Sequence, residues 1–190
     1  MATNQKFDRI VLKTSSDFSF VIREANPSDA DAMIELVTHY GNNADMIPLE
    51  PREFVPTRKD ELAWISSFQQ PNSLLLLAEN KGQLIGNIDL TGNTRRKMFH
   101  TAEMGMSVRK EFQGKGVGKE LLKHAIDWSN KNTFLELLWL QVYEDNAVAR
   151  KMYESFGFEV CGKQGNFFHE KRGRIANIIM TLQLQKKNSG

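Results

Sequence analysis

Hydrophobic residues recur along the chain at two spacings, which predict a series of strands and helices. Alternating or continuous apolar runs predict strands, whereas apolar positions three and four residues apart predict amphipathic helices. The expected strands cover residues 18–23, 73–79, 84–90, 101–108, 135–143, 158–162 and 176–184. The expected helices cover residues 28–41, 57–68 and 146–156, and a further helix carries Leu121, Leu122, Ala125, Ile126 and Trp128 at helical spacing.

Polar residues mark where these elements begin and end. Ser28 is a predicted N-cap and Gly41 a predicted helix stop, while Thr57 with Asp60 resembles an N-capping pattern. Three prolines without hydrophobic periodicity predict a long loop at residues 42–56. The last two strands are expected to be joined by a polar connection with two embedded aromatic residues, Phe167 and Phe168, within residues 164–174.

This order of elements predicts a single α+β domain spanning residues 1–190. Its centre is expected to be a mixed, mostly antiparallel sheet of six to seven strands, flanked by about four helices. The packed core is expected over about residues 18–184, with flexible termini on either side. A chain of 190 residues is long enough to bury such a core.

Composition excludes several classes of protein. The 25 basic and 23 acidic residues leave a net charge of +2, which gives no electrostatic case for binding nucleic acid or a membrane surface. A single cysteine, Cys161, excludes an internal disulfide and a cysteine-based zinc site, and we expect no metal. The N-terminus lacks the apolar core of a signal peptide, so a cytoplasmic location is the default expectation.

Three glycines two residues apart, Gly114, Gly116 and Gly118, separate the apolar strand at residues 101–108 from an amphipathic helix. The first N–H groups of a helix have no intrahelical partner and lie at the positive end of its dipole, so they bind anions. Glycines remove the side chains that would keep a phosphate away from the backbone. The junction is therefore a predicted phosphate-binding site.

The amino-acid sequence of this turn excludes two common phosphate-binding motifs. A P-loop requires a glycine where this chain has Gln113, and a Ser or Thr where it has Glu120, so the magnesium-holding hydroxyl is missing. A dinucleotide fingerprint requires a third glycine, but Lys119 or Leu121 stands at that position, depending on which glycine is taken first.

Residues 113–118, Gln-Gly-Lys-Gly-Val-Gly, resemble the acetyl-CoA signature Q/R-x-x-G-x-G/A of the GNAT superfamily of N-acetyltransferases. A second block also resembles that family: Asn146 begins a helix, and Tyr153, seven residues later, precedes a Gly-Phe turn. The resemblance covers residues 20–184, and the chain is identified as a member of the superfamily. It is similar to the bacterial group that includes ribosomal-protein and phosphinothricin acetyltransferases.

The resemblance implies that acetyl-CoA (coenzyme A) is the acetyl donor and assigns residues to it. The end of the strand would pair with the pantetheine arm, and the glycine turn would hold the pyrophosphate through its backbone N–H groups. Asn146 would reach the pantetheine, cap its helix, or do both. Lys115 and Lys119 would add positive charge, or are simply exposed lysines. The expected donor residues are Met106, Ser107, Val108, Gln113, Gly114, Lys115, Gly116, Val117, Gly118, Lys119 and Asn146.

Two side chains are candidates for moving protons. The resemblance places the Tyr153 hydroxyl near the cofactor sulfur, where it would protonate the departing thiolate; the alternative is that Tyr153 packs beside Phe156 in the core. Glu103 lies in an apolar strand, where a carboxylate is costly unless it is paired or functional. In many relatives a glutamate on this strand deprotonates the amine directly or through water. The alternative is a glutamate at a strand end that is partly solvated or paired with Arg95, Arg96 or His100.

The expected reaction is transfer of an acetyl group from the thioester to a primary amine. The acceptor is either a small molecule or a protein N-terminus or lysine, and many members of the group form homodimers. Ribosomal-protein acetyltransferases often carry a glutamate where this chain has Gln141, and an amide is no base, which shifts that role to Glu103. The loop at residues 42–56 is mildly acidic, through Asp45, Glu50 and Glu53, and would border the acceptor site. A non-catalytic acyl-CoA-binding sensor on the same fold is the alternative from another functional class.

Overall fold

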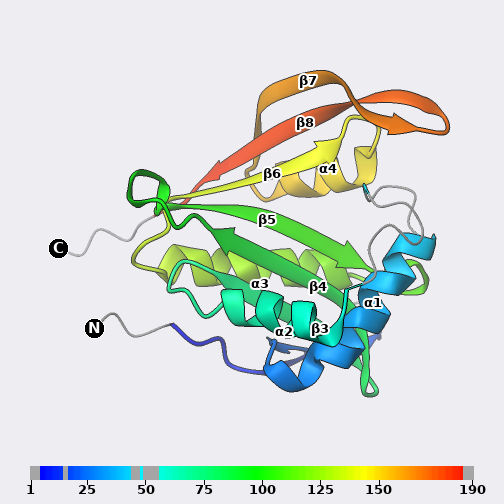
Figure 1. Ribbon diagram of the computed structural model, residues 1–190, viewed down its shortest axis with the longest axis vertical. Coiled ribbons are helices and arrows are strands. Elements are labelled where there is room, and N and C mark those ends of the chain that lie inside the picture. Colours follow the sequence, from blue (N-terminus) through cyan, green and yellow to red (C-terminus); the bar gives the residue numbers. More distant parts are fainter. Residues whose placement is uncertain (1–4, 15–16, 44–47, 49–55, 186–190) are drawn as a thin grey trace.

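The computed structural model describes residues 5–14, 17–43, 48 and 56–185, which form an open eight-stranded sheet with helices on both faces (Figure 1). The strands are β1 (Ile10–Lys13), β2 (Ser19–Glu24), β3 (Leu74–Asn80), β4 (Gln83–Gly92), β5 (Thr101–Val108), β6 (Leu137–Tyr143), β7 (Glu159–Glu170) and β8 (Gly173–Gln183). The α-helices of these described parts are α1 (Ala30–Asn43), α2 (Arg58–Ser67), α3 (Val117–Lys131) and α4 (Ala147–Ser155).

The strands are ordered β1-β2-β3-β4-β5-β6-β8-β7 across the sheet. All neighbours are antiparallel except β5 and β6, which are parallel. This confirms the predicted α+β class, the mostly antiparallel mixed sheet and the four helices. The sheet has eight strands, one more than the upper number expected, because residues 10–13 pair with β2.

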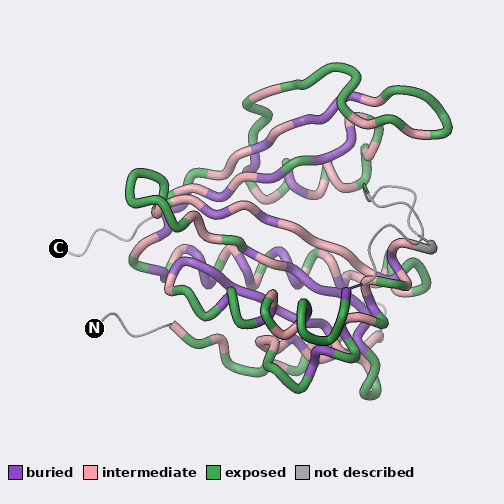
Figure 2. The backbone as a smooth tube through the Cα atoms, viewed as in Figure 1, coloured by how far each residue is buried: buried purple, intermediate pink, exposed green. Residues whose placement is uncertain are grey.

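Two apolar clusters hold the helices on opposite faces of the sheet. On one face, Leu121 and Leu122 of α3 and Tyr153 of α4 pack with the inward residues of β4, β5 and β6. On the other face, Leu36 of α1 and Ile65 of α2 pack with β3. Figure 2 shows the buried backbone concentrated in the central strands and α3, while β7 is largely exposed.

The parallel strands β5 and β6 separate after a short contact. Thr101, Ala102 and Glu103 of β5 are paired with Leu137, Leu138 and Trp139 of β6. The remaining five residues of β5 are not paired with β6. In Figure 1 the two strands diverge from this point toward their carboxyl ends. The second half of β5 and the second half of β6 are therefore splayed apart, and we call the unpaired region between these two strands the β5–β6 opening.

The segment before β2 is packed, although the core was expected to begin at about residue 18. The Trp128 Nε1–H of α3 donates to the Gln5 carbonyl oxygen at 3.0 Å, and Phe7, Ile10 and Leu12 pack against the first cluster. Residues 10–13 were missed because four residues flanked by polar sequence give too short a pattern to identify a strand.

Other boundaries also differ from the sequence prediction. Asn26, not Ser28, provides the cap, with its Oδ1 accepting from the Ser28 N–H at 3.0 Å, and α1 continues through Gly41 to Asn43. The predicted connection at residues 164–174 is instead mostly strand, because β7 and β8 form a long hairpin whose register shifts between Gln164 and Phe168.

The predicted cap of α2 is confirmed as a capping box, in which the Asp60 N–H donates to Thr57 Oγ1 and the Thr57 N–H donates to Asp60 Oδ2. Most of the predicted loop at residues 42–56, including Asp45, Glu50 and Glu53, lies outside the described residues. Within the described part of the chain, no helix has the length and apolar character needed to cross a membrane.

Candidate active site

The opening between β5 and β6 brings the two predicted motifs to one edge of the sheet. Parallel strands end at the same edge, so the segments that follow them meet there. The glycine turn and α3 follow β5, and Asn146 with α4 follows β6. Sequence blocks about thirty residues apart along the chain are therefore neighbours in the fold.

The end of β5 presents backbone groups to this opening. The Arg109 N–H donates to the Ile85 carbonyl oxygen of β4 at 2.9 Å. N–H groups alternate between the two edges of a strand, so the Val108 N–H faces the β6 side, where β6 does not pair with it. This unpaired edge, to which Met106 and Val108 direct their backbone groups on either side of Ser107, has the hydrogen-bonding capacity to bind an extended amide-containing ligand.

The glycine turn has the backbone conformation of an anion-binding loop. Gly114 and Gly116 have φ values of 72° and 86°, in the left-handed region that favours glycine. Gly116 is the N-cap of α3, and no side chain caps this helix. The first N–H groups of α3, from Val117 to Lys119, therefore remain available for an anion at the positive end of the helix dipole.

Gln113 and Lys115 have defined places in this turn. The Gln113 Nε2–H donates to the Val108 carbonyl oxygen at 3.1 Å, which ties the turn to the end of β5. The Lys115 ammonium lies 5.2 Å from the ring centre of Phe18 and 4.9 Å from that of Phe112. Contact with two rings keeps this charge beside the turn, so Lys115 is held in position rather than freely solvated.

Asn146 is the N-cap of α4, as one of its two predicted roles requires. Its Oδ1 accepts a hydrogen bond from the Ala149 N–H at 3.1 Å. The cap leaves the Asn146 side-chain NH₂ group as a donor at the edge of the opening.

Tyr153 is buried in α4, with 7% of its surface exposed, and its ring packs against Phe158 at a centroid distance of 5.8 Å. Phe158 is thus a ring neighbour of Tyr153, and Phe156 packs against the same apolar cluster. Burial raises the pKa of the hydroxyl to about 12, so the group stays protonated at neutral pH. Among the described residues the hydroxyl has no hydrogen-bond partner, which leaves it able to donate to a ligand.

Glu103 lies at the point where β5 and β6 separate, on the sheet face opposite Tyr153. Its Oε1 accepts a hydrogen bond from the Gln141 Nε2–H at 3.0 Å, so its described partner is Gln141 and not Arg95, Arg96 or His100. The Asn177 Nδ2–H in turn donates to Gln141 Oε1 at 2.6 Å. The two interactions fix which end of the Gln141 amide faces Glu103.

A second carboxylate, Asp89 on β4, lies on the same face and was missed in the sequence. A Cβ atom added to Gly105 would lie 2.8 Å from Asp89 Oδ1, so the carboxylate lies directly over Gly105. Burial, and then the negative charge of Glu103, raise the pKa of Asp89 to about 7, although hydrogen bonds from the Gly105 N–H and the Thr91 hydroxyl oppose the shift. The available signal was an acidic residue within an apolar strand, as for Glu103.

Helix α1 bounds this face of the opening. The Tyr40 hydroxyl donates to the Ser107 carbonyl oxygen at 3.0 Å, and burial raises the pKa of this hydroxyl. The Arg109 Nη2–H donates to Glu35 Oε1 at 2.7 Å. These two bonds attach α1 to the end of β5, beside the carboxylates.

Aromatic residues bound the opposite side of the same face. The rings of Tyr143 and Phe168 are stacked, with centroids 3.9 Å apart and planes 9° from parallel. The Tyr143 hydroxyl donates to Glu170 Oε1 at 2.6 Å, and burial with this bond raises its pKa. Phe167 meets Phe168 edge-on and is 52% exposed, so the β7–β8 hairpin presents an aromatic surface toward solvent.

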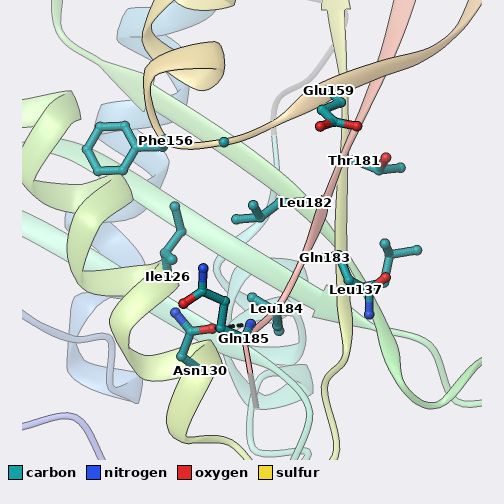
Figure 3. A pocket seen from close by; sticks show the side chains of 11 residues that line it. Ile126, Asn130, Leu137, Phe156, Glu159, Thr181, Leu182, Gln183, Leu184 and Gln185 are labelled. Atoms are coloured by element: carbon teal, nitrogen blue, oxygen red, sulfur yellow. Dashed lines mark hydrogen bonds between the residues drawn. The ribbon is translucent and has the colours of Figure 1, made fainter. Parts of the chain in front are cut away.

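A cavity of about 470 Å³ lies elsewhere, between the C-terminal ends of α3 and α4 and the end of β8 (Figure 3). Ile126, Phe156 and Thr181 are among its lining residues, and the Gln185 N–H donates to Asn130 Oδ1 at its edge. None of the predicted site residues lines this cavity, whereas both predicted motifs meet at the β5–β6 opening. The chemistry is therefore assigned to the opening.

Comparison with known proteins finds acetyltransferases among the similar sequences and structures. The model of the acetyltransferase (GNAT) family matches residues 43–158. The ribosomal protein bS18-alanine N-acetyltransferase of Escherichia coli K12 is 32% identical over 122 residues, which cover 60% of this chain and 82% of that protein. A GNAT-family acetyltransferase of Streptococcus pneumoniae superposes with a TM-score of 0.83 at 24% identity, covering 87% of this chain and 99% of its own. The structure of yncA from Salmonella typhimurium, with its cofactor acetyl-CoA, gives a TM-score of 0.77 at 22% identity, covering 90% of this chain and 97% of its own.

Proposed function

Because the chain belongs to the GNAT family of acetyltransferases, we propose that it transfers the acetyl group of acetyl-CoA to a primary amine. One observation carries the proposal: an uncapped helix N-terminus and an unpaired strand edge converge on the β5–β6 opening. The first suits a pyrophosphate and the second suits an amide-containing arm, and acetyl-CoA contains both. The fold relative yncA is itself a structure with its cofactor acetyl-CoA.

The described residues fit this donor. Gly114 and Gly116 leave the turn without side chains beside the uncapped N–H groups, and Lys115 holds a positive charge there. The pyrophosphate-binding residues in this proposal are Gln113, Gly114, Lys115, Gly116, Val117, Gly118 and Lys119. Met106, Ser107, Val108 and Asn146 bind the pantetheine arm. Bound acetyl-CoA supplies an acetyl group activated as a thioester.

Tyr153 and Glu103 are the proposed proton-moving residues, on opposite faces of the opening. An alkylamine is mostly protonated near pH 7, and it must lose a proton before it attacks a carbonyl carbon. Glu103 is the candidate base for this step, held by Gln141 at the apex of the opening. Tyr153, whose hydroxyl stays protonated, is the candidate acid that donates a proton to the leaving sulfur.

The acceptor is proposed to be a primary amine of a small molecule or a peptide. It approaches from the α1 side, where two carboxylates lie between α1 and the stacked Tyr143–Phe168 pair. Carboxylates attract a cationic amine, and an aromatic surface suits an apolar group next to it. A relative at 32% identity acts on the alanine of a ribosomal protein, which keeps a peptide acceptor among the candidates.

An acceptor screen tests the proposal. Purified protein is mixed with acetyl-CoA and polyamines, amino acids, aminoglycosides or short peptides, and release of free thiol is followed. At least one amine is expected to accelerate thiol release in proportion to protein concentration. If the protein binds acetyl-CoA but no amine accelerates release, the non-catalytic sensor becomes the better description.

Gly116→Ala is expected to weaken acetyl-CoA binding roughly tenfold while leaving the fold intact. A non-glycine residue at φ 86° carries a conformational cost of about 1–2 kcal/mol, and the new Cβ would lie 3.1 Å from Thr14 Cγ2. The turn relieves both by changing shape, which disturbs its N–H groups. Calorimetric titration with acetyl-CoA measures the effect.

Gly165→Ala is the control, because no atom lies within 4 Å of an added Cβ there and the residue lies in β7, outside the proposed donor site. It should bind acetyl-CoA as the wild type does. Equal affinities for the wild type and Gly116→Ala would remove the glycine turn from the proposed donor site.

A further inference from the structure

Two carboxylates face each other across neighbouring strands at the apex of the opening. Asp89 of β4 is opposite Gly105 of β5, and Glu103 is opposite Thr91. Glu103 and Gly105 are two residues apart, so Asp89 and Glu103 lie on the same face as diagonal neighbours. Such neighbours have Cα atoms roughly 7–8 Å apart, within reach of a glutamate side chain.

Each carboxylate has different partners. Glu103 accepts from the Gln141 amide, whose own oxygen is occupied by the Asn177 Nδ2–H, so Gln141 presents a donor to Glu103. Asn177 is completely buried, and its amide also donates to Gln164 Oε1 at 2.8 Å. A donor held in place in this way fixes the position of the Glu103 carboxylate.

The described neighbours of Asp89 are apolar or uncharged, apart from Glu103. Strand β3 places Leu75 opposite it, and β5 places Gly105 beneath its carboxylate. Among the ion pairs between described residues, none involves Asp89 or Glu103. Glu103 is the charged group that faces Asp89 from the described elements. Two carboxylates at this separation repel each other, and this repulsion is removed when they share one proton.

We propose that Asp89 and Glu103 act as one unit that binds the acceptor as an ammonium ion and removes its proton, which comes to rest on Asp89. This rests on the proposed acetyl transfer and divides the function of the base between two residues. Glu103, held in place by the Gln141 amide, supplies the charge that attracts the ammonium, and Asp89 supplies the accepting oxygen. One N–H bond of the ammonium breaks, one O–H bond forms on Asp89, and the electron pair stays on the nitrogen for attack. The proton later leaves Asp89 for solvent.

The pair itself is tested by NMR without any acceptor. Protein labelled with ¹³C at the aspartate carboxyl carbons is titrated from about pH 4 to pH 9, and Asp89→Asn identifies the Asp89 resonance by its loss. In the wild type this resonance is expected to titrate near pH 7. In Glu103→Gln its midpoint should move to lower pH, because the neighbouring charge is gone. An Asp89 midpoint near pH 4, or one that Glu103→Gln leaves unmoved, would overturn the proposal.

The catalytic part is tested with the best amine from the acceptor screen. For the wild type, kcat/KM should fall below about pH 7, as Asp89 becomes protonated. Asp89→Asn should lower kcat/KM at pH 7 by about 10²–10⁴-fold, the usual contribution of a positioned base. The deficit should shrink toward pH 10, where the amine loses its proton unaided. Asp127→Asn, an exposed aspartate paired with Lys123, is the matched control and should behave as the wild type.

The outcomes separate the two proposals. A wild type that acetylates no amine at any pH contradicts the proposed function, and the NMR titration then still decides whether the carboxylate pair exists. A wild type that is active, with an Asp89→Asn variant of unchanged rate and pH profile, contradicts the role of Asp89 alone. Circular dichroism of each variant establishes that it is folded before the rates are compared.

Discussion

Tyr153→Phe is expected to lower the rate of acetyl transfer about 10²–10⁴-fold, the range that a positioned general acid contributes. Burial raises the pKa of the Tyr153 hydroxyl to about 12, so the wild type holds a proton there at neutral pH. The hydroxyl has no partner among the described residues, which makes a bound ligand its natural acceptor. Phenylalanine removes this donor and nothing else from the opening.

The same substitution should leave the fold and the donor site unchanged. The phenylalanine ring of the variant retains the packing of the Tyr153 ring against Phe158, and no described hydrogen bond is lost. Thermal unfolding and the dissociation constant for acetyl-CoA should therefore match the wild type, while kcat falls. If kcat stays within a few-fold of the wild type, Tyr153 is a core residue and the leaving sulfur takes its proton elsewhere.

Wild-type stability is expected to decrease as pH rises from about 4 to about 8, and Asp89→Asn should remove most of this decrease. Asp89 has its pKa raised from 3.8 to about 7 by folding, so the folded state binds its proton more tightly than the unfolded state does. The protonated group therefore contributes fully to the free energy of unfolding below the unfolded pKa. This contribution is lost as pH rises through the folded pKa. A pKa difference of about three between the two states corresponds to at most about 4 kcal/mol in the free energy of unfolding. Solvent screening at this partly exposed side chain reduces that value.

Urea denaturation at pH 5 and pH 8 measures this effect. Asp89→Asn should gain on the order of 2–3 kcal/mol over the wild type between pH 5 and pH 8, because an amide carries no charge at either pH. Asp127→Asn serves as the control, since its partner Lys123 lies in solvent on the surface of α3. If Asp89→Asn changes the free energy of unfolding by the same amount at pH 5 and at pH 8, Asp89 titrates in its ordinary range.

Local patterns in the sequence predicted the elements whose cause is itself local. The capping pair Thr57 and Asp60, the glycine turn before α3 and the Asn146 cap each depend on residues within one turn of chain, and all are present in the fold. Strand β1 was missed because four residues carry too little pattern, and its stability comes from pairing with β2. The hairpin of β7 and β8 was underestimated because its exposed, bulged strand lacks regular alternation.

The candidate site was predicted in part for the same reason. Glu103 was noticed as a carboxylate in an apolar strand, but its partner Gln141 follows from the parallel pairing of β5 with β6. Asp89 acquires its unusual environment from the register that places it over Gly105 and beside Glu103. Such non-local pairings are not encoded in the spacing of any one segment, so the chemistry of Asp89 emerges only in the folded sheet.

We expect this protein to transfer acetyl groups rather than merely to bind acetyl-CoA, and a labelled transfer experiment distinguishes these two activities. The protein is incubated with acetyl-CoA carrying ¹³C in its acetyl group and with each amine of the acceptor panel, and products are identified by mass spectrometry. We expect a labelled acetyl-amide from at least one amine, in an amount equal to the coenzyme A released, and strongly reduced in Tyr153→Phe. Acetyl-CoA that binds but remains intact with every amine, or that is only hydrolysed to labelled acetate, would contradict the claim.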